Sequence, residues 1–577
     1  MKASPLTADR VKNLTNTPLL PVLVSLAVNL PATFLEVYRF SYDAYTHMFL
    51  ADHYRRDWFS LWDGRWFGGF NVASYPPLTH QLIASISFLT GLQTAFQIVS
   101  ILSATGLTYA VYLYSRIFLQ KGEAVYSAVS AALLPSVATT LHGFGQLPTI
   151  FAAATSLMAA CAVNNYLKNQ QPVSLIQAAS WIVVTAAAHH LTFVFFLPAA
   201  SLPVIFTHIR IGVKNLLYRI LILGLASLLL TVTVLSPFIQ FVTSQSEWRE
   251  IPHGSRKNIF LDFTLSTVFF WGMYSFTIFL LPHAVAIAYR RRALLPILVL
   301  VVFNFLLGLG GTTPIPRLLL GPLWPILTYD RFAFWASVLY TPFLGVIVGE
   351  RAGIFRKNRP DMGSPSTSRA SKAVSLAMVC GLAASFISVS FITILLNLQP
   401  MKGVSDEQIE RVADFLQRNK EWKYVTLGFD NKRILLNIMT DAPTIDGGYN
   451  QGKTSELLRS SGVESVDAAK HFPNGLTFLR RVIEIEGNNG LKYIISADQF
   501  YNQILRDYGL IPVLTVPGEK EVIVWEIPGT ANVPSYIKPE QDPSVTLIWG
   551  LGPILFLQAA LATTILRFTK QGHEHPD

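Results

Sequence analysis

Long uninterrupted stretches of apolar residues dominate the sequence and limit what it can fold into. About twelve such runs occur, most of them about 18 to 25 residues long, near residues 17–37, 95–116, 124–141, 148–167, 174–188, 191–208, 217–242, 262–288, 293–310, 332–349, 373–398 and 543–566. A helix of that length crosses a hydrocarbon core of about 30 Å. Only 14% of the 577 residues are charged, against roughly 25% in an average soluble domain. The chain is therefore predicted to be a polytopic α-helical membrane protein, and an ordinary soluble enzyme is excluded.

The basic residues indicate how these spans are oriented. The chain carries a net charge of +10, and its Lys and Arg side chains are concentrated in short loops that fall on one side, including residues 290–292 and the linker 351–372. Cytoplasmic loops of membrane proteins carry such an excess of positive charge. We therefore predict cytoplasmic termini, and we assign the charge to membrane topology and not to nucleic acid. The run 17–37 lacks a signal-peptide cleavage site and is predicted to be retained.

Changes in composition divide the chain into three parts. Residues 1–399 are predicted to form a transmembrane domain that contains an outer loop at residues 38–94. Residues 400–541 are polar and are predicted to form a small outer α/β domain. Residues 542–577 are predicted to form the final span and a cytoplasmic tail.

The polar segment has the pattern of alternating helices and strands. Ser405 and Gln408 have the spacing of a capping box and begin a predicted helix that continues to Arg418. Four strand-like runs follow, at 424–427, 493–495, 513–516 and 522–527. A helix is predicted at 499–508 and a turn at 518–520. Residues 446–451 are a Gly-rich polar turn, which we expect to be a surface loop, with contact to a ligand as the alternative.

The outer loop carries the most informative polar side chains. Asp43 and His47 are four residues apart, so on a short helix at the membrane interface they share one face. A carboxylate and an imidazole in that arrangement can act on one bound group. The alternative is an exposed charge at a helix start, which stabilises a helix by only about 0.3 to 1 kcal/mol. The spacing alone leaves both interpretations open.

Several motifs resemble those of the GT-C membrane glycosyltransferases. They are an aspartate after the first span, a Tyr-Pro-Pro-Leu element at 75–78, many further spans and an outer soluble domain. Within that superfamily, the chain is most similar to membrane proteins labelled 6-pyruvoyl-tetrahydropterin-synthase-related. This similarity rests on Asp43 with His47, on the Trp- and Gly-rich run 62–69, and on residues 329–332. The zinc-binding histidines of a soluble pterin synthase are not recognisable in the sequence.

The resemblance implies a reaction and assigns roles to particular residues. GT-C enzymes move a sugar from a polyprenyl-phosphate-linked donor to a lipid, glycan or protein acceptor on the outer face of the cell inner or plasma membrane. Loop 38–94 would then be catalytic, with Asp43 as the general base and His47 beside it. Arg331, at the outer mouth of a span, is expected to bind the donor phosphate, because a guanidinium binds phosphate through two hydrogen bonds. Contact with lipid headgroups is the alternative role for Arg331.

Further candidates lie on the same predicted face, where ionisable groups at a membrane edge are costly and therefore suggest function. The candidates for binding the donor phosphate are His142, His189 and His190. The candidates for supporting the loop or the acceptor are Asp63, Arg65 and Tyr75. Some GT-C enzymes hold a divalent metal with carboxylates, but a second acidic motif is not recognisable here. We expect inverting, metal-independent transfer, with a divalent metal left open.

Two other classes of function fit part of the sequence. A transporter or flippase of a lipid-linked substrate would explain the many spans, but it predicts charged or broken helices near the bilayer midplane, which are scarce here. A non-enzymatic membrane assembly protein would present the outer α/β domain to partners. In that case Asp43 and Arg331 would be dispensable.

Overall fold

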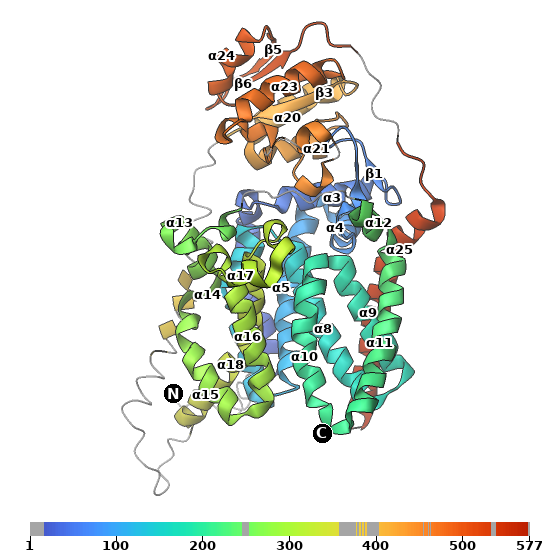
Figure 1. Ribbon diagram of the computed structural model, residues 1–577, viewed down its shortest axis with the longest axis vertical. Coiled ribbons are helices and arrows are strands. Elements are labelled where there is room, and N and C mark those ends of the chain that lie inside the picture. Colours follow the sequence, from blue (N-terminus) through green and yellow to red (C-terminus); the bar gives the residue numbers. More distant parts are fainter. Residues whose placement is uncertain are drawn as a thin grey trace, which may run out of the picture.

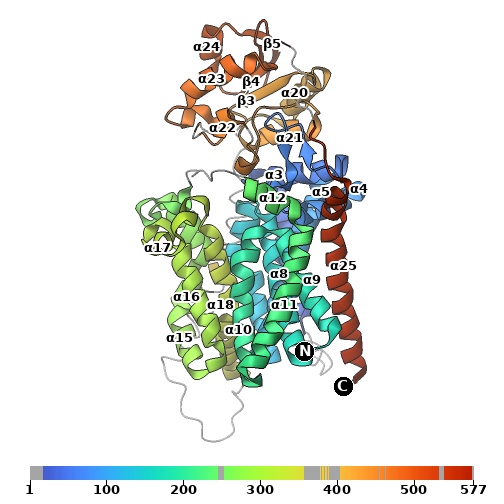
Figure 2. The same cartoon turned by 45° about the vertical axis from the view of Figure 1, so that its right-hand side comes forward.

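The structure is a computed structural model that describes residues 17–244, 253–356, a few positions between 377 and 388, 403–531 except 454, 460 and 462, and 538–574. The chain forms a long bundle of helices with a smaller α/β unit at one end (Figures 1 and 2). Most of the predicted linker 351–372 and of the predicted span 373–398 lies outside the described residues.

The bundle and its connecting loops contain most of the helices, and one short hairpin. The elements are α2 (Leu19–Phe34), α3 (Ala44–Arg56), β1 (Trp62–Asp63), β2 (Phe70–Asn71), α4 (Leu78–Thr90), α5 (Leu92–Ser115), α6 (Lys121–Ala132), α7 (Pro135–Ala138), α8 (Leu147–Asn169), α9 (Pro172–Ala188), α10 (Leu197–Thr207), α11 (Val213–Val234), α12 (Ser236–Ser244), α13 (Phe263–Ser266), α14 (Gly272–Tyr274), α15 (Leu281–Arg290), α16 (Leu295–Gly308), α17 (Ile315–Leu320), α18 (Asp330–Arg356) and α25 (Pro543–Glu574).

Six of the described helical segments are long and apolar enough to cross a membrane. They are Leu92–Ser115, Leu147–Asn169, Val213–Val234, Phe263–Arg290, Asp330–Arg351 and Pro543–Arg567. The pair Lys121–Ala132 and Pro135–Gly143 meets the same criterion as one span with a 42° bend. Four shorter apolar helices accompany them, at Leu19–Phe34, Pro172–Ala188, Thr192–Thr207 and Arg292–Gly308. The chain is an integral membrane protein, and the number of twelve spans stays a prediction.

Several of the basic connections contact the ends of neighbouring helices. Arg291, after α15, forms an ion pair of 2.8 Å with Glu123 at the start of α6 and one of 3.5 Å with Glu350 near the end of α18. Arg219 of α11 donates to the carbonyl oxygen of Leu167 near the end of α8. These loops are among those that we predicted, from their positive charge, to lie on the cytoplasmic side.

The α/β unit is built around one four-stranded sheet with strand order β3-β4-β6-β5. Strands β3 and β4 pair in parallel, whereas β4 with β6 and β5 with β6 pair antiparallel. Its elements are α20 (Asp406–Arg418), β3 (Lys423–Leu427), α21 (Arg433–Met439), α22 (Glu456–Arg459), α23 (Gly475–Gly487), β4 (Leu491–Ser496), α24 (Phe500–Asp507), β5 (Ile511–Val516) and β6 (Val522–Glu526).

Local signals in the sequence correctly located most of this unit. The Ser405 hydroxyl accepts from the backbone N–H of Gln408, and the Gln408 side chain accepts from the backbone N–H of Ser405, so the capping box is confirmed. All four predicted strands are present, and the turn at 518–520 joins β5 to β6. The pattern missed α21 and α23, which pack against the sheet and the loop of the bundle.

Apolar packing fixes the α/β unit to the bundle. One continuous cluster of buried side chains includes Phe49 of α3 and Trp66 and Phe67 of the hairpin, together with Ile434 and Ile445 of the α/β unit. Burying such residues stabilises an interface by roughly 25 cal/mol per Å² of apolar surface. The loop that carries Asp43 and the α/β unit therefore pack as one body.

Candidate functional site

Asp43 is positioned by two segments that pack against each other. It precedes α3, and its backbone N–H donates to the carbonyl oxygen of Phe144 at 2.9 Å. Gly145 has φ +73°, and a Cβ there would lie 2.7 Å from the backbone N of Ala44 and from Ser41 Oγ, so only glycine allows this approach. The Asp43 carboxylate makes no capping hydrogen bond to α3. It is thus not a helix-capping charge.

Arg331 and Asp330 lie at the first turn of α18. The Arg331 Nη1 donates to Thr328 Oγ1 at 2.7 Å, while its buried Nε has no partner among the described residues. Asp330 is only 2% exposed, and one of its carboxylate oxygens accepts from Gln146 Nε2 at 3.1 Å. Its other carboxylate oxygen has no hydrogen-bond partner among the described residues. Unpaired buried polar atoms are costly, so these atoms are available to a bound group.

The charges around Asp43 act on its ionisation. Burial raises the pKa of Asp43 to about 7, the Arg331 charge opposes that rise, and the Asp330 and Glu464 carboxylates add to it. A carboxylate with a pKa near neutral pH is suited to general-base catalysis, because it is ionised yet still basic at pH 7. Asp330 and Glu464 were not predicted from the sequence.

Four histidines surround the ring of Tyr75. The ring centroids of His47, His80, His189 and His190 lie 5.8, 5.2, 6.1 and 6.0 Å from that of Tyr75. The structure thus brings together His47, His189, His190 and Tyr75, and it adds His80. Among the described residues, the hydrogen bond of His47 Nδ1 is to His80 Nε2, at 3.0 Å, and not to Asp43.

These histidines are neutral hydrogen-bonding groups at pH 7. Burial lowers the pKa of His47 and of His189, and nearby ring charges and Arg331 lower both further. Burial lowers the pKa of His80 and of His190 to about 3. A neutral imidazole has one N–H donor and one acceptor nitrogen. The cluster can therefore bind and orient polar ligand atoms without adding positive charge.

His142 has a different environment. Its Nε2 lies 3.0 Å from Asn29 Oδ1 of α2, so this side chain connects two helices of the bundle. It belongs to a π-helical turn, Thr139–Gly143, and a second π-helical turn, Thr192–Phe196, follows His189 and His190. Such turns are rare and occur frequently at functional sites. They give irregular backbone to the helices that border the Asp43 site.

The α/β unit contributes two side chains to this site, both from loops. The Tyr449 hydroxyl donates to the carbonyl oxygen of Ser74 at 2.9 Å, and its ring lies 5.5 Å from that of Tyr75. Glu464 accepts from the Tyr42 hydroxyl at 2.5 Å. Neither side chain carries a sequence signal, because each reaches the site through contacts between residues several hundred positions apart.

The prediction of a surface loop at 446–451 is wrong. Asp446 is buried, and a Cβ on Gly447 would lie 2.5 Å from the Phe67 ring. A Cβ on Gly448 would likewise lie 2.7 Å from Thr46 Oγ1 of α3. The glycines are present because the loop packs closely against the hairpin and α3. Glycines flanked by an aspartate and a tyrosine were the available signal for such close packing.

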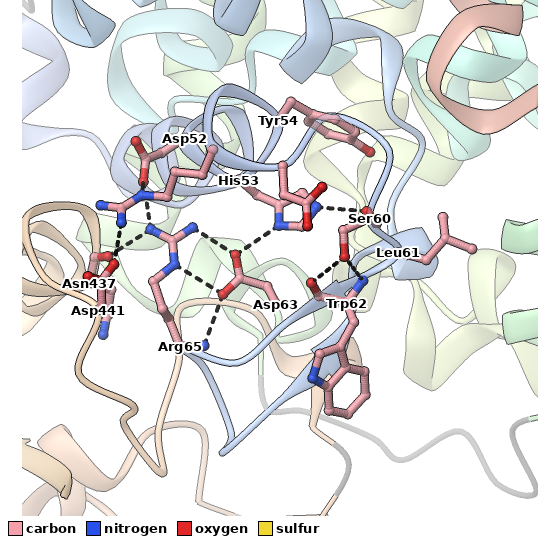
Figure 3. Close-up of polar contacts among 12 residues, drawn as sticks. Asp52, His53, Tyr54, Ser60, Leu61, Trp62, Asp63, Arg65, Asn437 and Asp441 are labelled. Atoms are coloured by element: carbon pink, nitrogen blue, oxygen red, sulfur yellow. Dashed lines mark hydrogen bonds and ion pairs between the residues drawn. The ribbon is translucent and has the colours of Figure 1, made fainter. Parts of the chain in front are cut away.

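Asp63 and Arg65 form part of a buried ionic network beside the site (Figure 3). Arg65 donates to both oxygens of Asp63, at 3.0 and 2.7 Å, and to Asp52 at 2.6 Å. His53 Nδ1 lies 2.9 Å from Asp63. Burial opposes ionisation of Asp63, but the Arg65 charge and these hydrogen bonds outweigh it, so the pKa of Asp63 lies well below its usual range.

The network ties the outer loop to the α/β unit. Arg65 donates to the carbonyl oxygen of Asn437 at 2.9 Å, and Trp66 Nε1 donates to the Asn437 side chain at 2.9 Å. The predicted loop residues Asp63 and Arg65 are therefore placed apart from Asp43, in a position that supports the loop. Among the described residues, no group of three or more His, Cys, Asp or Glu side chains could hold a metal ion.

The fold formed by the helical bundle, the loop that carries Asp43 and the α/β unit is similar to that of two solved structures. The apo oligosaccharyltransferase of Archaeoglobus fulgidus is similar with a TM-score of 0.55 and 10% identity, over 83% of this chain and 69% of that one. ArnT of Cupriavidus metallidurans, bound to undecaprenyl phosphate, is similar with a TM-score of 0.50 and 12% identity, over 88% and 98%.

No family model and no curated protein matches the chain. At these identities the two structures establish the fold. The narrower resemblance to the proteins labelled 6-pyruvoyl-tetrahydropterin-synthase-related stays a prediction.

Proposed function

We propose that the chain is a membrane glycosyltransferase that moves a sugar from a polyprenyl-phosphate-linked donor to an acceptor on the outer face. The observation that carries this proposal is that Asp43, whose pKa is raised to about 7, lies within electrostatic reach of Arg331, whose buried Nε has no partner in the described part of the chain. A base for the acceptor and a cation for the leaving phosphate are the two groups that such a transfer needs. The GT-C fold supports this assignment.

The reaction is a single displacement at the anomeric carbon. The acceptor atom attacks that carbon while its proton passes to the Asp43 carboxylate. The bond from the anomeric carbon to the phosphate oxygen breaks, and the lipid phosphate leaves as an anion beside Arg331. Because attack and departure occur on opposite sides of the carbon, the configuration inverts. General-base assistance of this kind typically contributes 10²- to 10⁴-fold.

Other groups of the site bind and orient the substrates. The N-terminus of α18 and the Arg331 guanidinium both favour an anion there. His189 and His190 supply neutral hydrogen bonds to the same phosphate, and His47 with Tyr75 borders the acceptor side. ArnT, which shares the fold, was solved with undecaprenyl phosphate bound, and this supports a lipid phosphate as the leaving group. No step of the proposal uses a metal.

The direct test is sugar transfer by the purified full-length protein. Polyprenyl-phosphate sugars and nucleotide sugars are offered in parallel, with membrane lipids, glycans and peptides as acceptors. Transfer from a lipid-phosphate donor supports the proposal. Transfer from a nucleotide sugar alone contradicts both the donor class and the placement of the site on the outer face.

We expect transfer to increase with pH along a limb centred near pH 7. Only the ionised Asp43 carboxylate accepts a proton, and its pKa is raised to about 7. The ionised fraction falls about tenfold for each pH unit below the pKa. The value of kcat/KM at pH 5 should therefore be about one hundredth of its plateau. A profile that is flat from pH 5 to pH 8, as an ordinary aspartate would give, contradicts the role of Asp43.

Substitution Arg331→Gln should change two parameters together. It removes charged hydrogen bonds to phosphate worth about 1.5 to 3 kcal/mol, so KM for the donor should rise about 10- to 150-fold. Because the Arg331 charge opposes protonation of Asp43, its loss should also shift the pH limb upward. The matched control is Arg480→Gln, an exposed arginine on α23. An unchanged KM for the donor would remove Arg331 from the phosphate site.

A further inference from the structure

A separate cavity lies at the other end of α3, between the outer loop and the α/β unit. Its volume is about 290 Å³, close to the lower end of small-molecule sites. The bundle contributes the end of α3 and the β1–β2 hairpin, and the α/β unit contributes the connections that follow α20 and α21. The length of α3, 13 residues, places the cavity about 20 Å from Asp43. It is therefore not part of the reacting cluster.

The charges that line this cavity balance one another. Three cations and three carboxylates lie on its wall, namely Arg56, Arg65, Lys420, Asp57, Asp63 and Asp441. Most of them are already paired within the protein, as Arg56 with Asp441 at 2.6 Å and Arg65 with Asp63 at 2.7 Å. A wall with no net formal charge does not favour a phosphate or a carboxylate ligand. It does offer both donors and acceptors to a neutral polar ligand.

Trp62 supplies a fixed aromatic surface on the same wall. A Cβ on Gly69 would lie 2.2 Å from the indole ring, so the ring rests directly on the glycine backbone. Figure 3 shows the indole extending away from the bonded network of Asp63 and Arg65. Trp62 lines the cavity, and its indole Nε1–H can only donate a hydrogen bond. An indole ring held in place, with its N–H donor, is suited to binding a ring-shaped polar ligand.

Two exposed charged groups complete the set of available partners. Lys420 Nζ lies 3.8 Å from Asp441, too far for a hydrogen bond. Asp57 uses one carboxylate oxygen for Lys538 at 3.0 Å, and the other oxygen can accept. The cavity therefore combines an apolar ring face with one ammonium, one carboxylate oxygen and one indole N–H.

We propose that this cavity is a binding site for a neutral saccharide unit. A sugar ring has an apolar C–H face that fits the indole, and a rim of hydroxyls that both donate and accept. The cavity volume admits about one such unit. At its distance from Asp43, it holds a part of a glycan remote from the bond that reacts. This proposal goes beyond the glycosyltransferase assignment, because saccharide binding needs neither a donor nor transfer.

The test is saccharide binding by the full-length protein in an amine-oxide detergent, whose headgroup carries no sugar. The probes are maltotriose, cellotriose, mannotriose and chitotriose, with trigalacturonate as the charged comparison, followed by saturation-transfer NMR. We expect at least one neutral trisaccharide to bind. Trp62→Ala should weaken that binding about tenfold or more, and Lys420→Ala about threefold. Phe500→Ala, which removes an aromatic residue that is 50% exposed on α24, should leave it unchanged.

Three results would overturn the proposal. The first is a folded Lys420→Ala or Trp62→Ala protein that binds the neutral trisaccharide as tightly as the wild type. The second is trigalacturonate binding as tight as that of the neutral trisaccharides. The third is no binding of any neutral trisaccharide at about 10 mM. Lys420 is exposed, so its variant keeps the test valid if Trp62→Ala does not fold. Asp43→Asn should bind the trisaccharide normally. Binding that persists there while transfer is lost separates the two proposals.

Discussion

Replacement of Asp43 by Asn is expected to lower kcat/KM for sugar transfer about 10²- to 10⁴-fold. The amide keeps the volume of the side chain but cannot take a proton from the acceptor, which must then lose it to water. Because the Asp43 carboxylate makes no capping bond to α3, the substitution removes no hydrogen bond that holds the helix. Transfer from a polyprenyl-phosphate sugar by the purified protein, over a range of acceptor concentrations, measures the loss.

The control for this variant is another carboxylate whose loss should not matter. Asp507, exposed on α24, accepts from Gln503 at 2.7 Å and lies outside the site. Asp507→Asn should therefore transfer at the wild-type rate. The pH profile of the residual transfer activity in Asp43→Asn should also lack the rise centred near pH 7. Transfer near the wild-type rate in Asp43→Asn would refute the catalytic assignment, whatever the result for Asp507.

The same variant distinguishes an enzyme from a lipid transporter. If the chain moves a lipid-linked sugar across the bilayer, translocation in proteoliposomes should be measurable without any acceptor. If it is an enzyme, the sugar leaves its lipid phosphate only when an acceptor is present, and Asp43→Asn slows that step. Translocation that survives in Asp43→Asn, together with no transfer in the wild type, would favour the flippase interpretation.

The sequence predicted the parts of the fold that depend on neighbouring residues. Helical spans follow from continuous apolar runs, and the capping box at Ser405 and Gln408 defines the start of α20 from two side chains three residues apart. The strands of the α/β unit follow from short β-branched and aromatic runs. Broken helices were not predictable in this way. The region 262–288, expected as one span, is long and apolar enough to be one at Phe263–Arg290, but it contains a π-helical turn, Thr267–Trp271, which no apolar run predicts.

The candidate site was predictable only in part, for a related reason. Asp43, His189 and Arg331 stand out because a charge or an imidazole interrupts or borders an apolar run. Asp330 was overlooked beside Arg331, since one charge next to another at a span end carries no separate signal. Tyr449 and Glu464 lie on loops of the α/β unit, and their role depends on how that unit packs on α3. Such packing is a long-range property that no local pattern encodes.

Loss of the Asp52 charge is expected to cause the largest drop in stability. Asp52 is 0% exposed and accepts from three arginines, with distances of 2.7 Å to Arg55, 2.6 Å to Arg56 and 2.6 Å to Arg65. Removing the acceptor of a buried hydrogen bond costs about 1 to 3 kcal/mol, and more for charged groups, and Arg65, only 8% exposed, loses such a partner here. Asp52→Asn should therefore unfold at a clearly lower temperature than the wild type.

A surface ion pair provides the matched comparison. Glu407→Gln removes the exposed pair with Arg411 on α20, and such pairs contribute about 0 to 1 kcal/mol. The two variants should therefore differ severalfold in their effect on unfolding. Similar unfolding temperatures for Asp52→Asn and the wild type would show that the network contributes little to stability.

The effect of Asp52→Asn should extend to the site, because Asp52 holds the residues that dock the α/β unit. Arg56 reaches the carbonyl oxygen of Ile438 at 2.6 Å, and Arg65 reaches that of Asn437 at 2.9 Å. When these contacts loosen, the loop that carries Tyr449 is no longer fixed against Ser74. Transfer should then fall even at temperatures where the bundle stays folded, and proteolysis should separate the α/β unit from the bundle. Full transfer activity in a protein whose α/β unit is readily released would show that Tyr449 and Glu464 are not needed at the site.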